Sequence, residues 1–177
     1  MYYHFSFMVL KMTLQQNIIS ILILFFSIIL YSHADDSYRA TVIDVHDGDT
    51  ITIDVNGKQS KVRLSKIDAP ELKQDVGVSS QRFLSKLILG KSVWINEENT
   101  DIHGRILASI KTSRGLDVGL EQVKKGFAWV YRRYSRDPLF VDAEDSAQAR
   151  RIGLWSNDKP IPPWEFRNKV NNSIKKE

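Results

Sequence analysis

The sequence predicts an α+β domain in which β-strands dominate the first half and helices the second. Three observations lead to this fold class. Apolar and polar residues alternate from Arg39 onward, an Asn56-Gly57 pair interrupts the alternation, and the apolar spacing becomes helical from Val78. A period of two is typical of half-buried strands, whereas a period near 3.6 is typical of amphipathic helices.

The first three strands are predicted at residues 39–45, 50–55 and 59–66. Asn56 and Gly57 both accept a positive φ, so this pair favours the tight turn of a β-hairpin. The turn directs the second strand back into the third, and the three segments should form an antiparallel meander. Residues 67–77 show little periodicity and are predicted to form a loop.

Three helices and two further strands complete the predicted order. The helices are expected at about residues 78–89, 117–125 and 137–151, and the strands at about residues 92–96 and 106–111. Gly90, Gly126 and Gly153 lie where these helices should stop, because glycine adopts the left-handed conformation that ends helices. A closed five-stranded Greek-key barrel with a helix after its third strand is the OB-fold pattern. The sequence therefore predicts an OB-fold barrel with about three helices.

The N-terminus carries an apolar run typical of an export signal. Residues 18–30 are almost entirely apolar, and no acidic residue occurs before Asp35. This run is shorter than the ~20 residues of a membrane-spanning helix, and Ser32-His33-Ala34 offers small residues for cleavage. We expect residues 1–34 to be a signal peptide that leads to the periplasm or the medium. The alternative is a retained membrane anchor with the domain outside the cytoplasm.

A single domain is expected at residues 35–167, followed by a flexible polar tail at residues 168–177. The absence of cysteine excludes disulfides, zinc–thiolate sites and a cysteine nucleophile. The net charge of +4 falls to +3 when the leader takes Lys11 with it. This mild positive charge permits a nucleic-acid partner without requiring one, because a solvated mixed-charge surface has the same composition.

Two aspartates are candidate metal ligands. Asp49 begins the second predicted strand and Asp68 follows the third, so the hairpin should bring both to one rim of the barrel. Hard cations such as Ca²⁺ bind carboxylate and carbonyl oxygens, and water or a substrate phosphate completes their coordination. The alternative is structural, because Asp-Gly-Asp is a common turn and an aspartate before a loop often bonds its own backbone.

Three charged residues near this rim are candidate catalytic groups. Glu71 follows Asp68 by three residues and could accept a proton from an attacking water. Arg63 and Arg105 carry guanidinium groups that match two phosphate oxygens and stay charged. They would stabilise the charge that develops on phosphorus oxygens in the transition state. The alternatives are a loop glutamate bonded to backbone amides and two surface arginines.

Aromatic and basic residues gather before the third predicted helix. Tyr131 and Tyr134 alternate with arginines, a composition suited to stacking bases and following a nucleic-acid backbone. His103 lies beside Arg105 and could also contact substrate. A loop that packs on its own tyrosines is an equally good interpretation.

These motifs together resemble the thermonuclease, or staphylococcal nuclease-like, family over nearly all of residues 38–167. The residues that carry the resemblance are Asp47–Thr50 (DGDT), Val62–Glu71 (VRLSKIDAPE), Gly104-Arg105, Gly126–Ala128, Glu144 with Ala147, Gly153–Trp155 and Pro163–Arg167. The resemblance implies an OB-fold barrel with three helices, a monomer, and a Ca²⁺-dependent endonuclease that acts on DNA and RNA and leaves 3′-phosphorylated products.

Roles for single residues follow from the same resemblance. Asp49 and Asp68 look like the Ca²⁺ carboxylates, and the backbone carbonyl of Ala69 looks like a third ligand. The catalytic trio would be Arg63, Glu71 and Arg105. Two departures stand out: His103 replaces an aromatic residue found in many members, and the loop after Glu71 is short.

The sequence thus leads to the hypothesis of an exported, Ca²⁺-dependent endonuclease with little sequence specificity. Its partners would be DNA and RNA substrates, with no stable protein partner, and with a membrane only if the apolar segment is retained. Two alternatives are a non-catalytic OB-fold module that binds nucleic acid and an envelope-tethered scaffold.

Overall fold

The computed structural model describes residues 16–17 and 36–174, and the fold lies in the compact unit that begins at Ser37. The expected leader, residues 1–34, falls outside the described residues apart from 16–17. Within the described ranges, no helix has both the length and the apolar character needed to cross a membrane.

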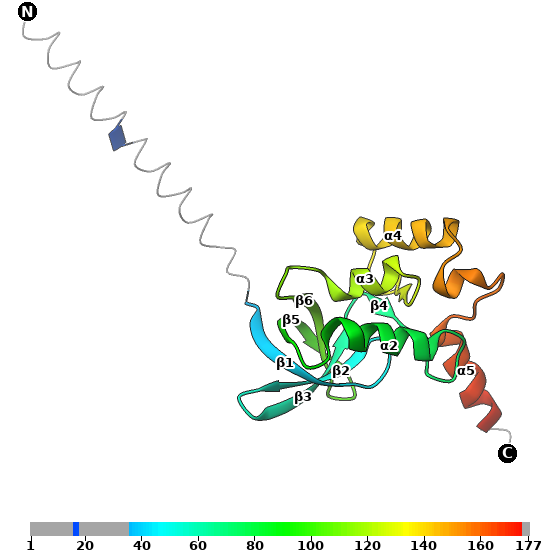
Figure 1. Ribbon diagram of the computed structural model, residues 1–177, viewed down its shortest axis with the longest axis horizontal. Coiled ribbons are helices and arrows are strands. Elements are labelled where there is room, and N and C mark those ends of the chain that lie inside the picture. The colour runs from blue at the N-terminus through cyan, green and yellow to red at the C-terminus, as the bar shows by residue number, and fades with distance from the viewer. Residues whose placement is uncertain (1–15, 18–35, 175–177) are drawn as a thin grey trace, which may run out of the picture. The chain divides into compact units, whose positions relative to one another are not determined.

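Five strands form a closed barrel in the order β1-β2-β3-β6-β5 (Figure 1). The strands are β1 (Tyr38–Val45), β2 (Thr50–Val55), β3 (Lys58–Leu64), β5 (Ser92–Thr100) and β6 (Ile106–Thr112). Strands β1, β2 and β3 form the predicted antiparallel meander, and β3 closes the barrel by pairing parallel to β6. The predicted fold class is therefore confirmed.

The remaining elements surround this barrel. They are β4 (Ile67–Asp68), α2 (Gly77–Ile88), α3 (Val118–Lys124), β7 (Trp129–Val130), α4 (Pro138–Ala149), the 3₁₀-helix η1 (Gly153–Ser156) and α5 (Pro163–Ile174). The prediction of a loop over residues 67–77 is wrong at its start, because β4 pairs antiparallel with β7 and forms a second, two-stranded sheet. Figure 1 shows α3 and α4 lying side by side.

The core consists of aliphatic side chains that the alternating strand pattern directs inward. Strand residues that are buried to 2% exposure or less include Val42, Ile51, Ile53, Val62, Leu64, Ile95 and Ile110. Helices add the buried side chains of Leu84, Ile88, Val118, Val123 and Phe140. A second, smaller cluster contains Ala147, Leu154 and Trp155. The larger of these two clusters lies within the barrel and beneath the rim from which the polar residues of the site project.

Two glycines of the sequence motifs meet in space. Gly126 ends α3 with a φ of 66°, and Gly153 begins η1 with a φ of 58°. A Cβ on Gly126 would lie 2.3 Å from the carbonyl oxygen of Ile152, and one on Gly153 would lie 2.3 Å from that of Gly126. The amide of Leu154 donates to the Gly126 carbonyl at 2.8 Å. Only glycine permits this backbone approach at both positions.

The C-terminal segment differs from the prediction. Residues 168–174, expected to belong to a flexible polar tail, are part of α5, so the described unit has four α-helices rather than about three. Pro163 occupies the first helical position, where its missing N–H costs nothing, and the carbonyl of Pro162 accepts bonds from the next turn at 3.1 Å. Side chains of this first turn anchor the helix to the domain, which polar composition alone does not reveal.

Candidate active site

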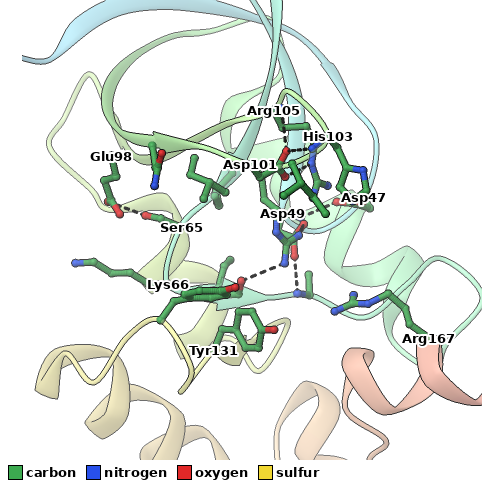
Figure 2. A pocket seen from close by; sticks show the side chains of 18 of the residues that line it. Asp47, Asp49, Ser65, Lys66, Glu98, Asp101, His103, Arg105, Tyr131 and Arg167 are labelled. Carbon is green, nitrogen blue, oxygen red and sulfur yellow. Dashed lines mark hydrogen bonds and ion pairs between the residues drawn. The ribbon is translucent and has the colours of Figure 1, made fainter.

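The predicted site residues converge on one cavity of about 850 Å³ (Figure 2). Its wall is built from the β1–β2 turn, the end of β3, the segment from β4 to Glu71, the bend between β5 and β6, and the segment after β7. All predicted site residues except Asp68 line it: Asp49, Arg63, Ala69, Glu71, His103, Arg105, Tyr131 and Tyr134. Asp68 is fully buried behind this wall.

Strand pairing places the first charged groups. Thr50 of β2 lies opposite Arg63 of β3, and the amide of Leu64 donates to the carbonyl of Asp49 at 2.8 Å. Asp68 comes four residues after β3 ends, in β4, where it lies opposite Trp129 of β7. The hairpin and the small sheet therefore deliver both aspartates to one side of the barrel, as the sequence predicted.

The guanidinium of Arg63 joins the two aspartates. Its Nη1 donates to Asp49 Oδ1, and its Nη2 donates to Asp68 Oδ1 at 2.7 Å. Asp49 also accepts from the amide of Ala69 at 2.7 Å through Oδ2 and from the hydroxyl of Thr50 at 3.0 Å through Oδ1. Asp49 and Asp68 are 2% and 0% exposed, so this is a buried ion triad.

The Asp47-Gly48 turn, which precedes Asp49, is itself held by hydrogen bonds. Asp47 Oδ1 accepts from the amides of Asp49 and Thr50 at 2.9 and 2.7 Å, the structural role that aspartate often plays in turns. A Cβ on Gly48 would lie 1.9 Å from the hydroxyl of Ser80 in α2. The side-chain amide of Gln122, in α3, donates to the Gly48 carbonyl at 2.6 Å. Two helices thus fix the turn that carries Asp49.

Burial and neighbouring charges have opposite effects on the pKa values of this buried group. Burial raises the pKa of Asp49 to about 7, with Arg63 opposing the rise and Asp47 and Asp68 adding to it. Burial lowers the pKa of Arg63, but the carboxylates of Asp49 and Asp68 raise it above its ordinary value. Burial thus favours the neutral form of Asp49, and a cation beside it would favour the ionised form.

The donor set fits a hard divalent cation held by few protein ligands. In the described part of the chain, no cluster of three or more His, Asp and Glu side chains is arranged to bind a metal, so a closed cage of protein ligands is not present there. Asp49 and Asp68, with the carbonyl of Ala69, supply only oxygen atoms, which suits Ca²⁺ or Mg²⁺. The open cavity beside them leaves room for water and phosphate oxygens.

Glu71 lies on the loop at the mouth of the cavity. Its side chain is 37% exposed, unlike the two aspartates, and Oε1 accepts from Arg167 Nη1 at 2.8 Å. Its amide donates to Gln74 Oε1 at 2.9 Å. The carboxylate is therefore both reachable by water and held in place, as a general base must be.

Arg105 reaches the cavity from the bend between β5 and β6. Its Nε donates to Asp101 Oδ2 at 2.7 Å, and its amide donates to Asp101 Oδ1 at 3.0 Å. Partial burial raises the pKa of Asp101, but its hydrogen bonds, including those from Arg105, lower the pKa below its ordinary value. Parallel pairing of Val62 with Ile106 brings this bend beside β3 and hence beside Arg63. Among the described residues, Asp101 is the only hydrogen-bonding partner of the Arg105 side chain.

The predicted aromatic contacts divide into packed and exposed side chains. Tyr131 stacks on Trp164 with ring centroids 5.8 Å apart and meets Tyr134 edge-on at 4.9 Å. Tyr134 is 71% exposed at the cavity, and His103 is also exposed there. Tyr131 thus belongs to the packing of the loop, whereas Tyr134 and His103 are free to meet a ligand.

Sequence similarity agrees with this geometry. The family model described as staphylococcal nuclease homologue matches residues 61–157. The chain belongs to this family. The match covers the Arg63, Asp68, Glu71 and Arg105 positions, and the family predicted from the sequence motifs is confirmed.

Similar proteins carry nuclease descriptions. One from Haemophilus influenzae, described as an uncharacterized endonuclease, is 41% identical over 133 residues, which cover 73% of this chain and 74% of that protein. Another uncharacterized endonuclease, from Escherichia coli, is 39% identical over 128 residues, covering 72% and 84%. A micrococcal nuclease from Shigella flexneri is 33% identical over 146 residues, covering 77% and 84%.

Sequence reasoning assigned no role to one residue of this staphylococcal nuclease-like site. Arg167, in α5, donates from Nη2 to Asp68 Oδ2 at 2.7 Å and from Nη1 to Asp68 Oδ1 at 3.3 Å, besides its bond to Glu71. Figure 2 shows its side chain extending from α5 toward the cavity. Partial burial lowers the pKa of Arg167, but these carboxylates raise it above its ordinary value. The available signal was the Pro163–Arg167 motif, which includes this arginine.

Removal of the Arg63 guanidinium should destabilise the metal-free protein. Arg63→Met leaves two buried carboxylates without their shared partner, so the free energy of unfolding should fall by about 3–5 kcal/mol. Urea unfolding in the presence of chelator measures this change. Lys61→Met alters an exposed lysine of the same strand and should change stability by less than about 0.5 kcal/mol. Equal stabilities for the two variants would contradict a structural role for the triad.

Proposed function

We propose that this chain is a Ca²⁺-dependent endonuclease that hydrolyses phosphodiester bonds of DNA and RNA with little sequence specificity and leaves 3′-phosphorylated products. The hydrolase class follows from the family: the chain is a nuclease of the staphylococcal nuclease-like type. The observation that supports the finer proposal is the convergence of buried Asp49, accessible Glu71, Arg63 and Arg105 on one cavity, with buried Asp68 bonded to Arg63.

The carboxylates divide into two roles according to their exposure. Asp49 and Asp68 are buried and both contact Arg63, and we assign them, with the Ala69 carbonyl, as the residues that would hold a cation. When bound, a divalent cation would polarise a phosphoryl oxygen and offset charge on it. Glu71 remains in contact with solvent and can take a proton from the water that attacks phosphorus.

The arginines act on the charge that develops during this attack. The new bond joins the water oxygen to phosphorus, and the bond from phosphorus to the 5′ oxygen breaks, after which that oxygen takes a proton from solvent. Arg105 is fixed through its Nε by Asp101, which directs its remaining nitrogens to phosphate oxygens. Arg63 holds the aspartates and faces the same cavity. A preorganised guanidinium favours the transition state over the ground state.

Substitution of Glu71, the proposed base, or of Arg105, the proposed phosphate-binding residue, should reduce turnover strongly. Glu71→Gln keeps the shape of the side chain but cannot accept the proton, so kcat should fall by ~10²–10⁴-fold.

Arg105→Lys replaces the planar guanidinium, which can bond two phosphate oxygens, with an ammonium group. For this variant kcat should fall by ~10²–10³-fold. Initial rates on plasmid DNA and on RNA measure both effects. Asp142→Asn, which neutralises an exposed acid of α4, should cut at the rate of the unaltered protein. Unchanged rates in either active-site variant would remove its residue from the mechanism.

Metal removal should abolish cleavage. With chelator, the purified protein should leave DNA and RNA intact, and Ca²⁺ in excess should restore cutting, because the buried carboxylates need a cation to receive a phosphate. End-group analysis of the fragments should find 3′-phosphates. Binding of nucleic acid without any cleavage in Ca²⁺ or Mg²⁺ would instead establish a non-catalytic OB-fold module.

We further propose that the protein is exported and that residues 1–34 are removed. The support is the short apolar run with small residues at its end. N-terminal sequencing of the protein recovered from cells and medium should begin near Asp35. A chain that still carries its first residues in the membrane fraction would favour the anchored alternative.

A further inference from the structure

The segment from Ile161 to Arg167, here called the C-terminal clasp, makes two polar contacts with the loop that carries Glu71. Arg167 Nη1 donates to the Glu71 carboxylate at 2.8 Å. The side-chain amide of Gln74 donates to the Ile161 carbonyl at 2.9 Å, while its oxygen accepts from the Glu71 amide at 2.9 Å. Both the side chain and the backbone of Glu71 are thus connected to the clasp.

Arg167 also connects Glu71 to a buried aspartate. Its two terminal nitrogens bond both oxygens of Asp68, which is 0% exposed, and one of them bonds Glu71 as well. A single guanidinium therefore sets the separation between the proposed base and a proposed metal ligand. Because both terminal nitrogens are bonded to carboxylates, Arg167 acts on the reaction through these groups rather than on the phosphate.

Packing holds the clasp against the domain. Trp164 stacks on Tyr131 at 5.8 Å and meets Trp129 edge-on at 5.7 Å. On the other side of the loop, Gly77 approaches Glu71 so closely that a Cβ would lie 2.0 Å from the Glu71 carbonyl oxygen. The loop between Glu71 and α2 is therefore confined from both ends, and its conformation depends on the clasp.

We propose that the C-terminal clasp positions the general base, and that Arg167 is a positioning residue which fixes Glu71 relative to Asp68. This inference rests on the proposed function, because it assigns Arg167 a role in the same hydrolysis. A base on a short exposed loop gains its precision from a helix that lies almost a hundred residues further along the chain. Small misplacement of such a group is costly, since catalysis depends on its geometry to within ~1 Å.

The test compares four variants with the unaltered full chain. Arg167→Gln removes both the guanidinium group and its charge, whereas Arg167→Lys keeps a charge without the guanidinium group. Gln74→Ala removes the side-chain bonds to the Glu71 amide and the Ile161 carbonyl. Lys169→Gln is the matched control on an exposed face of α5. In Ca²⁺, kcat of both Arg167 variants should fall by ~10–100-fold with KM within about twofold, as for residues that orient others. Lysine should not restore kcat, because one ammonium group cannot bridge both carboxylates. The Lys169→Gln control should be unaffected.

A second readout does not depend on activity or on metal. Hydrogen exchange of the amides of residues 71–77 should become about tenfold faster in Arg167→Gln and in Gln74→Ala, because each loses a contact that holds this loop. Exchange of the barrel strands should stay unchanged. This separates loss of positioning from general destabilisation, which would accelerate exchange throughout the domain and would count against the proposal.

The outcomes distinguish the inference from the proposed function. Absence of cleavage by the unaltered chain in Ca²⁺ would overturn both. Cleavage by the unaltered chain together with full kcat in Arg167→Gln, full rescue by Arg167→Lys, or unchanged exchange of the loop would overturn the positioning role alone. A raised KM with full kcat would make Arg167 a substrate contact and would also overturn it.

Discussion

The buried triad of Arg63 with Asp49 and Asp68 is the interaction on which the site depends. Its members come from a turn, from β3 and from β4, so one guanidinium ties three segments of the barrel rim together. Two carboxylates without exposure to water repel each other strongly in a medium of low dielectric constant. Burial raises the pKa of Asp49 to about 7, because the contact with Arg63 offsets only part of the cost of removing this carboxylate from water. A cation beside Asp49 would therefore stabilise its ionised form.

Support for the triad extends outward through secondary structure. Asp68 keeps its position because β4 pairs with β7, and β7 is held by Glu144 of α4, whose carboxylate accepts from the amide of Val130 at 2.7 Å. The contact of Gly126 with Gly153 fixes the chain on either side of this unit. Glu144 and these glycines, which lie outside the cavity, are therefore connected to the site through the placement of β7.

Local signals in the sequence were sufficient for the barrel and for most of the site. Alternation and the Asn56-Gly57 turn fix the register of β2 and β3, which in turn places Asp49 beside Arg63. The two-residue strands β4 and β7 were not predictable, because pairs so short form only when tertiary contacts bring them together. The role of Arg167 was missed for the same reason, because its partner Asp68 is 99 residues away and no local pattern connects the two.

The different surroundings of the three carboxylates agree with the roles that we propose for them. A metal ligand gains from burial on rigid strands, and Asp49 and Asp68 have this environment. A group that exchanges protons with water must stay exposed, and Glu71 lies on a loop, where backbone positions are ordinarily the least fixed. Exposure and precision therefore conflict at Glu71. The conflict is resolved by contacts from outside the barrel, since Arg167 holds the carboxylate and Gln74 holds the backbone. In the proposed mechanism, the C-terminal helix therefore belongs to the catalytic unit.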